Sequence, residues 1–109
     1  MRCCGEVTEG KLEALRKADG ILREVILESG QGKRLSRYFA VMTDSRALAA
    51  QEGYGWVCAL RAVIEQGTGF TPGKLPYDLL DRVGERILAE VPGVGRVVYD
   101  ISGGAVEWE

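Results

Sequence analysis

The side chains of this chain that could take part in chemistry are cysteines, arginines and carboxylates, because its 109 residues include no histidine. Without histidine there is no imidazole base for a serine or cysteine nucleophile and no imidazole ligand for a metal. Cys3 and Cys4 are adjacent, so they lack the two-residue spacer of a zinc knuckle or a redox loop. No phosphate-binding loop or nucleophile elbow occurs either. We therefore expect no catalytic residue and no metal site in this chain.

The length and composition are typical of one small domain that spans residues 1–109. Its 14 basic residues against 16 acidic ones leave a net charge of −2, which argues against a nucleic-acid partner. No apolar stretch is long enough to cross a bilayer and no signal peptide is visible, so we expect no membrane partner. The 3 cysteines are an odd number, which argues against a disulfide framework and favours a cytoplasmic location.

Two amphipathic segments predict helices that must position whatever site exists. The first runs from about Lys11 to Glu28, with apolar residues at helical spacing and Thr8 as its N-cap. The second runs from Pro76 to Glu90, with proline in its first turn. Its acids are typical of a solvated helix face rather than of an active site: Asp78, Asp81 and Glu85.

Alternating apolar residues predict strands at 37–43, 54–64 and 94–101, of which the first two form a hairpin. We also expect a short leading strand at 2–7 and an edge strand at 105–109. This order predicts an α+β fold with a small, mostly antiparallel sheet of three or four strands and both helices packed on one face.

The sheet face away from the helices is expected to be uncovered and partly apolar. Arg61, Arg96 and Asp100 lie on it by alternation, among the valines Val57, Val63 and Val98. Such a face indicates a partner or a second copy of the chain, or it is an ordinary solvated face, and the pattern leaves both readings open. Cys58 alternates onto the helix side instead, so we predict a buried, unreactive thiol there.

A resemblance to a known family rests on several ordered stretches: ALRAV, KLPYDLL, VPGVGRVVYDIS, the terminal VEWE, and RCCGEVTEGKLEALRKADGILREVI near the N-terminus. They resemble the C-terminal dimerisation domain of GMP synthase, the glutamine-hydrolysing amidotransferase of purine synthesis. The resemblance covers nearly the whole chain. It implies a domain that dimerises the enzyme and helps to bind xanthosine monophosphate (XMP) during its ATP-dependent amination to GMP.

The resemblance also implies what this chain lacks. The full enzyme has a glutaminase domain that releases ammonia and an ATP-pyrophosphatase domain that adenylylates XMP with ATP and magnesium. Neither set of motifs occurs in these residues, so the chain is not expected to be catalytic alone or to hold a cofactor. We expect a homodimer that binds XMP weakly and works with an ATP-pyrophosphatase domain or subunit.

The XMP contacts of the family carry over at Arg96, Val106 and Glu107. Arg96 matches the arginine of the family's NRVVYDIS motif, where a planar guanidinium suits a phosphate through two charge-assisted hydrogen bonds. Val106 and Glu107 match contacts in the family's tail. From the residues alone, Arg96 could instead pair with Asp100, and Glu107 could be a solvated tail carboxylate.

The tail and the ligand loops depart from the family pattern. Gly103 and Gly104 stand where the family has Lys-Pro-Pro, whose lysine is a phosphate contact. The stretches at 47–53 and 68–74 also lack the family's loop motifs. The alternative function is therefore a stand-alone homodimerisation module that has lost nucleotide binding.

Overall fold

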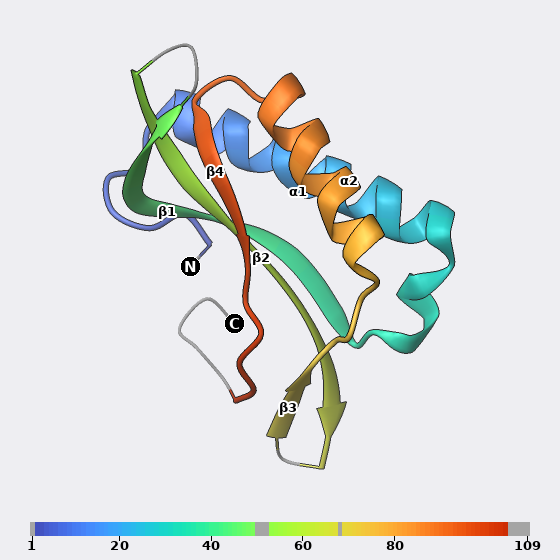
Figure 1. Ribbon diagram of the computed structural model, residues 1–109. Helices are drawn as coiled ribbons and strands as arrows, with labels where there is room; N and C mark the ends of the chain where they lie inside the picture. The colour runs from blue at the N-terminus through green and yellow to red at the C-terminus, as the bar shows by residue number, and fades with distance from the viewer. Residues whose placement is uncertain (1, 50–52, 68, 105–109) are drawn as a thin grey trace.

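The computed structural model of the chain describes residues 2–49, 53–67 and 69–104, and it confirms the predicted α+β fold (Figure 1). Both helices pack on one face of a four-stranded sheet. The elements follow in the order α1 (Glu9–Ser29), the short 3-10 helix η1 (Gln31–Arg34), β1 (Arg37–Ala49), β2 (Gly53–Gln66), β3 (Gly69–Pro72), α2 (Tyr77–Glu90) and β4 (Val94–Tyr99).

Capping residues stand at both ends of α1 and at the start of α2. The Thr8 side chain accepts a hydrogen bond from the Lys11 amide at 3.2 Å, which confirms Thr8 as the N-cap of α1. Gly30 closes the helix with a left-handed backbone, φ 77°, a conformation that glycine adopts without steric cost. Pro76 precedes α2, and its carbonyl accepts from the Leu79 amide at 3.0 Å. Neither helix in the described part of the chain combines the length and apolarity that crossing a bilayer requires.

Strand β2 is the centre of the sheet. It pairs with β1 along one edge in the predicted antiparallel hairpin, and its other edge is shared by β3 and β4. β3 pairs antiparallel with the end of β2, while β4 runs parallel to its middle part. The sheet is therefore mostly antiparallel, as expected, but β3 was not predicted and β1 extends to Ala49 rather than ending at Thr43.

A bulge bends β1 where its predicted end was placed. Met42 pairs with Cys58 and Arg46 pairs with Trp56, so residues 43–45 oppose the single residue between those partners. The Thr43 hydroxyl donates to the carbonyl of Val57 at 2.7 Å and fixes the bulge. Extra residues on one strand increase its local twist, which turns the far half of the hairpin toward β4 (Figure 1).

Beyond the bulge, three backbones meet at two glycines. A Cβ built on Gly95 would lie 2.7 Å from the Ala47 carbonyl oxygen and 3.1 Å from the Gly55 Cα. A Cβ on Gly55 would lie 2.6 Å from the Gly95 amide nitrogen. Real Cβ atoms do not approach backbone this closely, so glycine at both positions is what allows β1, β2 and β4 to cross here.

The main core lies between the helices and the sheet. Its buried strand residues are those that alternation assigned to the helix side, including Cys58, Leu60 and Ala62, and they pack against the apolar stripes of both helices. The prediction that Cys58 is buried is confirmed. Burial, with a smaller contribution from the charge of Asp19, raises the pKa of the Cys58 thiol to about 12.

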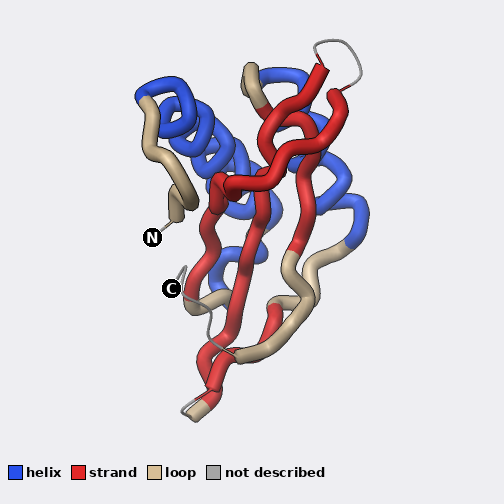
Figure 2. Tube along the Cα trace, turned by 90° about the vertical axis from the view of Figure 1, so that its left-hand side faces the viewer, coloured by secondary structure: helices blue, strands red, loops and turns tan. Residues whose placement is uncertain are grey.

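The opposite face of the sheet is open only in part, so the expectation of an uncovered face was wrong at Arg61 and Val63, whereas Val98 on β4 is exposed. Phe39, Val41, Arg61 and Val63 on this face are all completely buried. The N-terminal segment and the segment after β4 both lie on this side, away from the helices (Figures 1 and 2). The expected leading strand is reduced to a single bridge between Cys3 and Met42. The predicted edge strand at 105–109 lies outside the described residues.

Candidate functional site

Arg96, the predicted phosphate contact, is an exposed residue near the start of β4. By alternation its side chain belongs to the sheet face away from the helices, together with Val98. Among the described residues no ion pair of Arg96 is found, so its guanidinium is available to an anionic ligand. Val106 and Glu107, the other predicted contacts, lie outside the described residues.

Asp100, the alternative partner of Arg96, is held by Arg61 instead. The Nη1 atom of Arg61 lies 2.5 Å from the Oδ2 atom of Asp100. The Arg61 side chain is fully buried and that of Asp100 is 19% exposed, so the pair is largely shielded from water. Asp100 therefore pairs with Arg61, which lies 39 residues before it in the chain, and not with Arg96.

Arg61 also binds the chain that follows Asp100, which we call the C-terminal strap (residues 100–104). Its guanidinium donates to the carbonyls of Ser102, at 3.3 Å, and of Gly104. Sequence reasoning missed this role. The signal that could have found it is a charged residue at a position that alternation assigns to an otherwise apolar strand face.

The strap has further hydrogen bonds of its own. The Asp100 amide donates to the Leu60 carbonyl at 2.9 Å and so continues the pairing of β4 with β2. The Ser102 amide donates to the Asp100 carboxylate at 2.9 Å, and the Gly104 amide donates to the Phe70 carbonyl at 3.0 Å. The strap thus runs from the end of β4 across to β3 on the same side of the sheet as Arg96.

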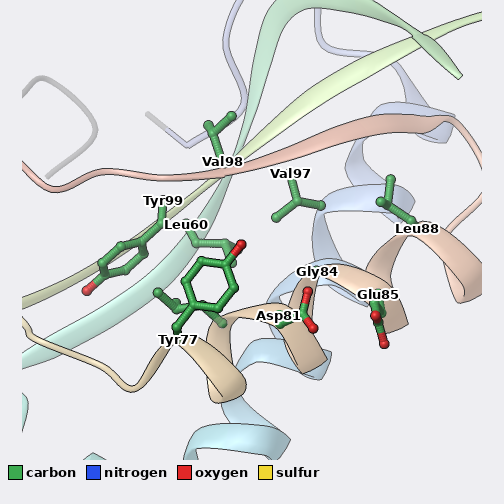
Figure 3. Close-up of a pocket in the computed structure, with 10 residues that line it drawn as sticks. Leu60, Tyr77, Asp81, Gly84, Glu85, Leu88, Val97, Val98 and Tyr99 are labelled. Atoms are coloured by element: carbon green, nitrogen blue, oxygen red, sulfur yellow. The ribbon is translucent and has the colours of Figure 1, made fainter.

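A shallow groove of about 300 Å³ lies between α2 and β4 (Figure 3). Figure 3 shows Val97 directed toward α2, where Leu88 and Glu85 lie along the helix, while Val98 points to the other side of β4. The remaining lining residues are Leu60, Tyr77, Leu80, Asp81, Gly84 and Tyr99. The lining is mainly apolar and its charged groups are carboxylates, so this groove suits an apolar protein surface better than a phosphate.

At one end of the groove, the hydroxyl of Tyr99 already has a hydrogen-bond partner within the chain. The Tyr99 hydroxyl donates to the Gly73 carbonyl at 2.6 Å, which ties β4 to the segment that enters α2. Partial burial raises the pKa of Tyr99 to about 12, so this hydroxyl remains a donor at neutral pH. Tyr99 is therefore a structural contact and not a candidate acid or base.

The outer edge of β4 borders the same groove. In the parallel pairing with β2, the amides of Arg96, Val98 and Asp100 point to β2, so the backbone polar groups of Val97 and Tyr99 point to the outer edge. Within residues 2–49, 53–67 and 69–104, no strand pairs with that edge. Exposed apolar side chains flank it: Tyr77, Leu88, Val98 and Ile101. Unpaired strand edges of this kind are available to another chain.

Metal-ligating side chains do not gather in the described part of the chain. No group of three histidine, cysteine, aspartate or glutamate residues close enough to hold a metal ion is present there.

Comparison with known proteins identifies what the chain resembles. The profile of the family described as GMP synthase C terminal domain matches residues 24–108. The glutamine-hydrolysing GMP synthases of Geobacillus kaustophilus and Aeropyrum pernix are 40% and 43% identical to it over its whole length. A separate subunit of the glutamine-hydrolysing GMP synthase of Methanocaldococcus jannaschii is 40% identical over 94% of the chain.

The chain covers only a part of each relative. It spans 23% of the length of the Geobacillus and Aeropyrum proteins and 34% of the Methanocaldococcus subunit.

Proposed function

Because this chain belongs to the GMP synthase C-terminal domain family, we propose that it completes a GMP synthase by joining two copies of the enzyme and contributing to XMP binding. An ATP-pyrophosphatase domain or subunit then performs the amination of XMP to GMP with ATP and magnesium. The similarity to a subunit of a GMP synthase and to much longer chains supports a domain that works with others. The cytoplasmic location stays a prediction.

The observation that carries the XMP proposal is the position of Arg96. Its guanidinium has no ion pair among the described residues and lies on the same side of the sheet as the C-terminal strap, which leads directly into the segment with Val106 and Glu107. A phosphate bound by Arg96 gains two parallel charge-assisted hydrogen bonds from one rigid side chain. Glu107 is proposed to contact the ribose hydroxyls, because a carboxylate accepts from such donors.

Adding XMP to the isotope-labelled chain is expected to produce saturable NMR shifts at Arg96, Val106 and Glu107. The shifts should require the phosphate, so xanthosine should not produce them. Arg96→Gln should weaken binding at least tenfold, which corresponds to about 1.4 kcal/mol. Arg82→Gln, on the exposed face of α2, is the matched control and should bind like the original chain. Absence of saturable shifts at millimolar XMP would favour the stand-alone dimerisation module.

The loss of the family's tail lysine favours that second candidate. Gly103 and Gly104 carry no side chain that could contact a phosphate, and their backbone freedom raises the entropy lost when a tail closes over a ligand. The second candidate function is therefore a stand-alone homodimerisation module that does not bind XMP.

The dimer proposal rests on the outer edge of β4. A second copy related by a two-fold axis would pair its own β4 antiparallel to this edge and join the two sheets. The apolar side chains beside the edge, Leu88 and Val98, would be covered at the same time.

Leu88→Arg is expected to raise the dimer dissociation constant at least tenfold in sedimentation equilibrium, because it places a desolvated charge at the edge of the proposed interface. Leu27→Arg is the matched control, since Leu27 is an exposed leucine on α1, away from β4. It should leave the association unchanged. An equal effect of both substitutions, or a monomeric original chain at 11.9 kDa, would contradict this interface.

A further inference from the structure

We propose that Arg61 is a positioning residue whose buried guanidinium fixes the C-terminal strap (residues 100–104) against the sheet. This inference rests on the proposed function, because the strap matters for XMP binding only through the proposed contacts Val106 and Glu107, which follow it in the sequence after Ala105. In the proposed function, Arg61 itself contacts neither the phosphate nor the ribose of XMP.

The geometry of the guanidinium supports this role. The Nη1 atom reaches the Asp100 carboxylate at 2.5 Å and the Ser102 carbonyl at 3.3 Å, while Nη2 donates to the Gly104 carbonyl. One planar group thus contacts the beginning, the middle and the end of the five-residue strap. A lysine ammonium at this position could not hold such spaced acceptors at once, because it is a compact charge on a flexible stem.

The surroundings of Arg61 show that the fold alone does not need a charge there. Phe39 lies directly opposite Arg61 in the β1–β2 register, and Ala59 and Val63 are its neighbours on the same face of β2. An apolar side chain of similar volume would fill this place without the desolvation cost of a buried ion. The buried charge is instead matched to acceptors that belong to the strap.

The composition of the strap explains why it needs a tether. Gly103 and Gly104 give it backbone freedom, and Gly104 has a positive φ of 85°. A Cβ on Gly103 would lie 3.0 Å from the Phe70 carbonyl oxygen, so a glycine also allows the strap to pass close to β3. Without side chains that could pack at these glycines, this part of the strap depends on hydrogen bonds for its position, and Arg61 provides those that come from the centre of the sheet.

The test compares Arg61→Lys and Arg61→Met with the matched control Arg82→Lys in the full 109-residue chain. Backbone order is measured by ¹⁵N relaxation at Ser102, Gly103 and Gly104. Both Arg61 variants are expected to lower the order parameters of the strap from about 0.85 to below about 0.6, while β1 and β2 stay rigid. XMP affinity should fall at least tenfold in both, with the Arg96 signal still responding to saturating XMP.

The outcomes separate this inference from the proposed function. Unchanged order of the strap in Arg61 variants that fold would overturn the inference, whether or not XMP binds. A loosened strap with unchanged XMP affinity would overturn the positioning role and leave the proposed function standing. If the original chain binds no XMP, the proposed function fails and the relaxation data alone decide what Arg61 does.

A second variant, Asp100→Asn, tests the same inference if Arg61→Met does not fold. Asp100→Asn keeps Arg61 and removes the charge of its partner, which is 19% exposed. It should loosen the strap at Ser102 and leave the strand core intact, because asparagine has one acceptor oxygen and cannot accept from both Arg61 and the Ser102 amide. A strap as ordered as in the original chain would count against the inference.

Discussion

Replacing Gly95 with alanine is expected to lower the free energy of unfolding by about 1–3 kcal/mol or more, although alanine is ordinarily better than glycine in a strand. The new Cβ would lie 2.7 Å from the Ala47 carbonyl oxygen and 3.1 Å from the Gly55 Cα. Both are backbone atoms, so the strain can be relieved only if β1 or β2 moves away from β4. Urea unfolding followed by circular dichroism and tryptophan fluorescence measures the change.

The matched control is Gly20→Ala on α1. A Cβ added to Gly20 would meet no heavy atom within 4 Å beyond its own stretch of helix, so alanine should stabilise the domain by about 1 kcal/mol. The same chemical change is thus expected to have opposite signs at the two sites. A Gly95→Ala chain as stable as the original would show that the three backbones do not cross as closely as described.

A double-mutant cycle sharpens this prediction. Gly55→Ala should also destabilise the domain, because its Cβ would lie 2.6 Å from the Gly95 amide nitrogen. Once either methyl group has separated the strands, the second should cost less than it does alone. Additive effects would contradict a single shared crossing point.

The thiol of Cys58 is expected to resist alkylation by iodoacetamide far more strongly than that of Cys4. Burial raises the pKa of Cys58 from 9.0 to about 12, which lowers its thiolate fraction at about pH 8 roughly a thousandfold. Cys4 is only partly buried and serves as the internal control. Peptide mass spectrometry of timed reactions follows each thiol separately. Equal labelling rates in the folded chain would contradict the buried position.

The same raised pKa predicts how stability depends on pH. Because the folded pKa lies above the unfolded one, the contribution of Cys58 is fully present below its ordinary pKa of 9.0 and is lost as pH rises toward about 12. Over that range the free energy of unfolding should fall by about 1.4 kcal/mol per pH unit. Cys58→Ala should remove this slope. The pKa of Tyr99 is raised from 10.0 to about 12, so Tyr99 makes the free energy of unfolding fall more steeply between about pH 10 and pH 12. Tyr99→Phe should remove this additional pH dependence.

Local sequence signals were sufficient for both helices and for the hairpin. Apolar residues at helical spacing, the Thr8 cap and the glycine after α1 act over a few residues, so the chain itself encodes these ends. Strand β2 alternates without interruption, and that alternation correctly assigned Cys58 and Leu60 to the helix side. The ordered motifs along the chain were likewise enough to identify the family.

The errors at β1 and β3 have different physical causes. The bulge at residues 43–45 adds two residues to one strand and interrupts the ladder, so the predicted strand ends at Thr43 while pairing continues to Ala49. β3 is short, and its glycine and proline at Gly69 and Pro72 are typical of loops. It exists because the end of β2 offers it an edge, which is a property of the assembled sheet.

Only the tertiary structure decided what covers the second face of the sheet and which charges meet there. Alternation shows that Arg61 and Arg96 point away from the helices, but it carries no information about segments distant in the chain. Folding buries Arg61 beneath the C-terminal strap with Asp100 and leaves Arg96 exposed. The sequence by itself determined the helices, the central hairpin and the family, because these depend on local periodicity and ordered motifs. The pairing of Arg61 with Asp100 joins residues that are distant in the sequence, so only the folded chain brings them together.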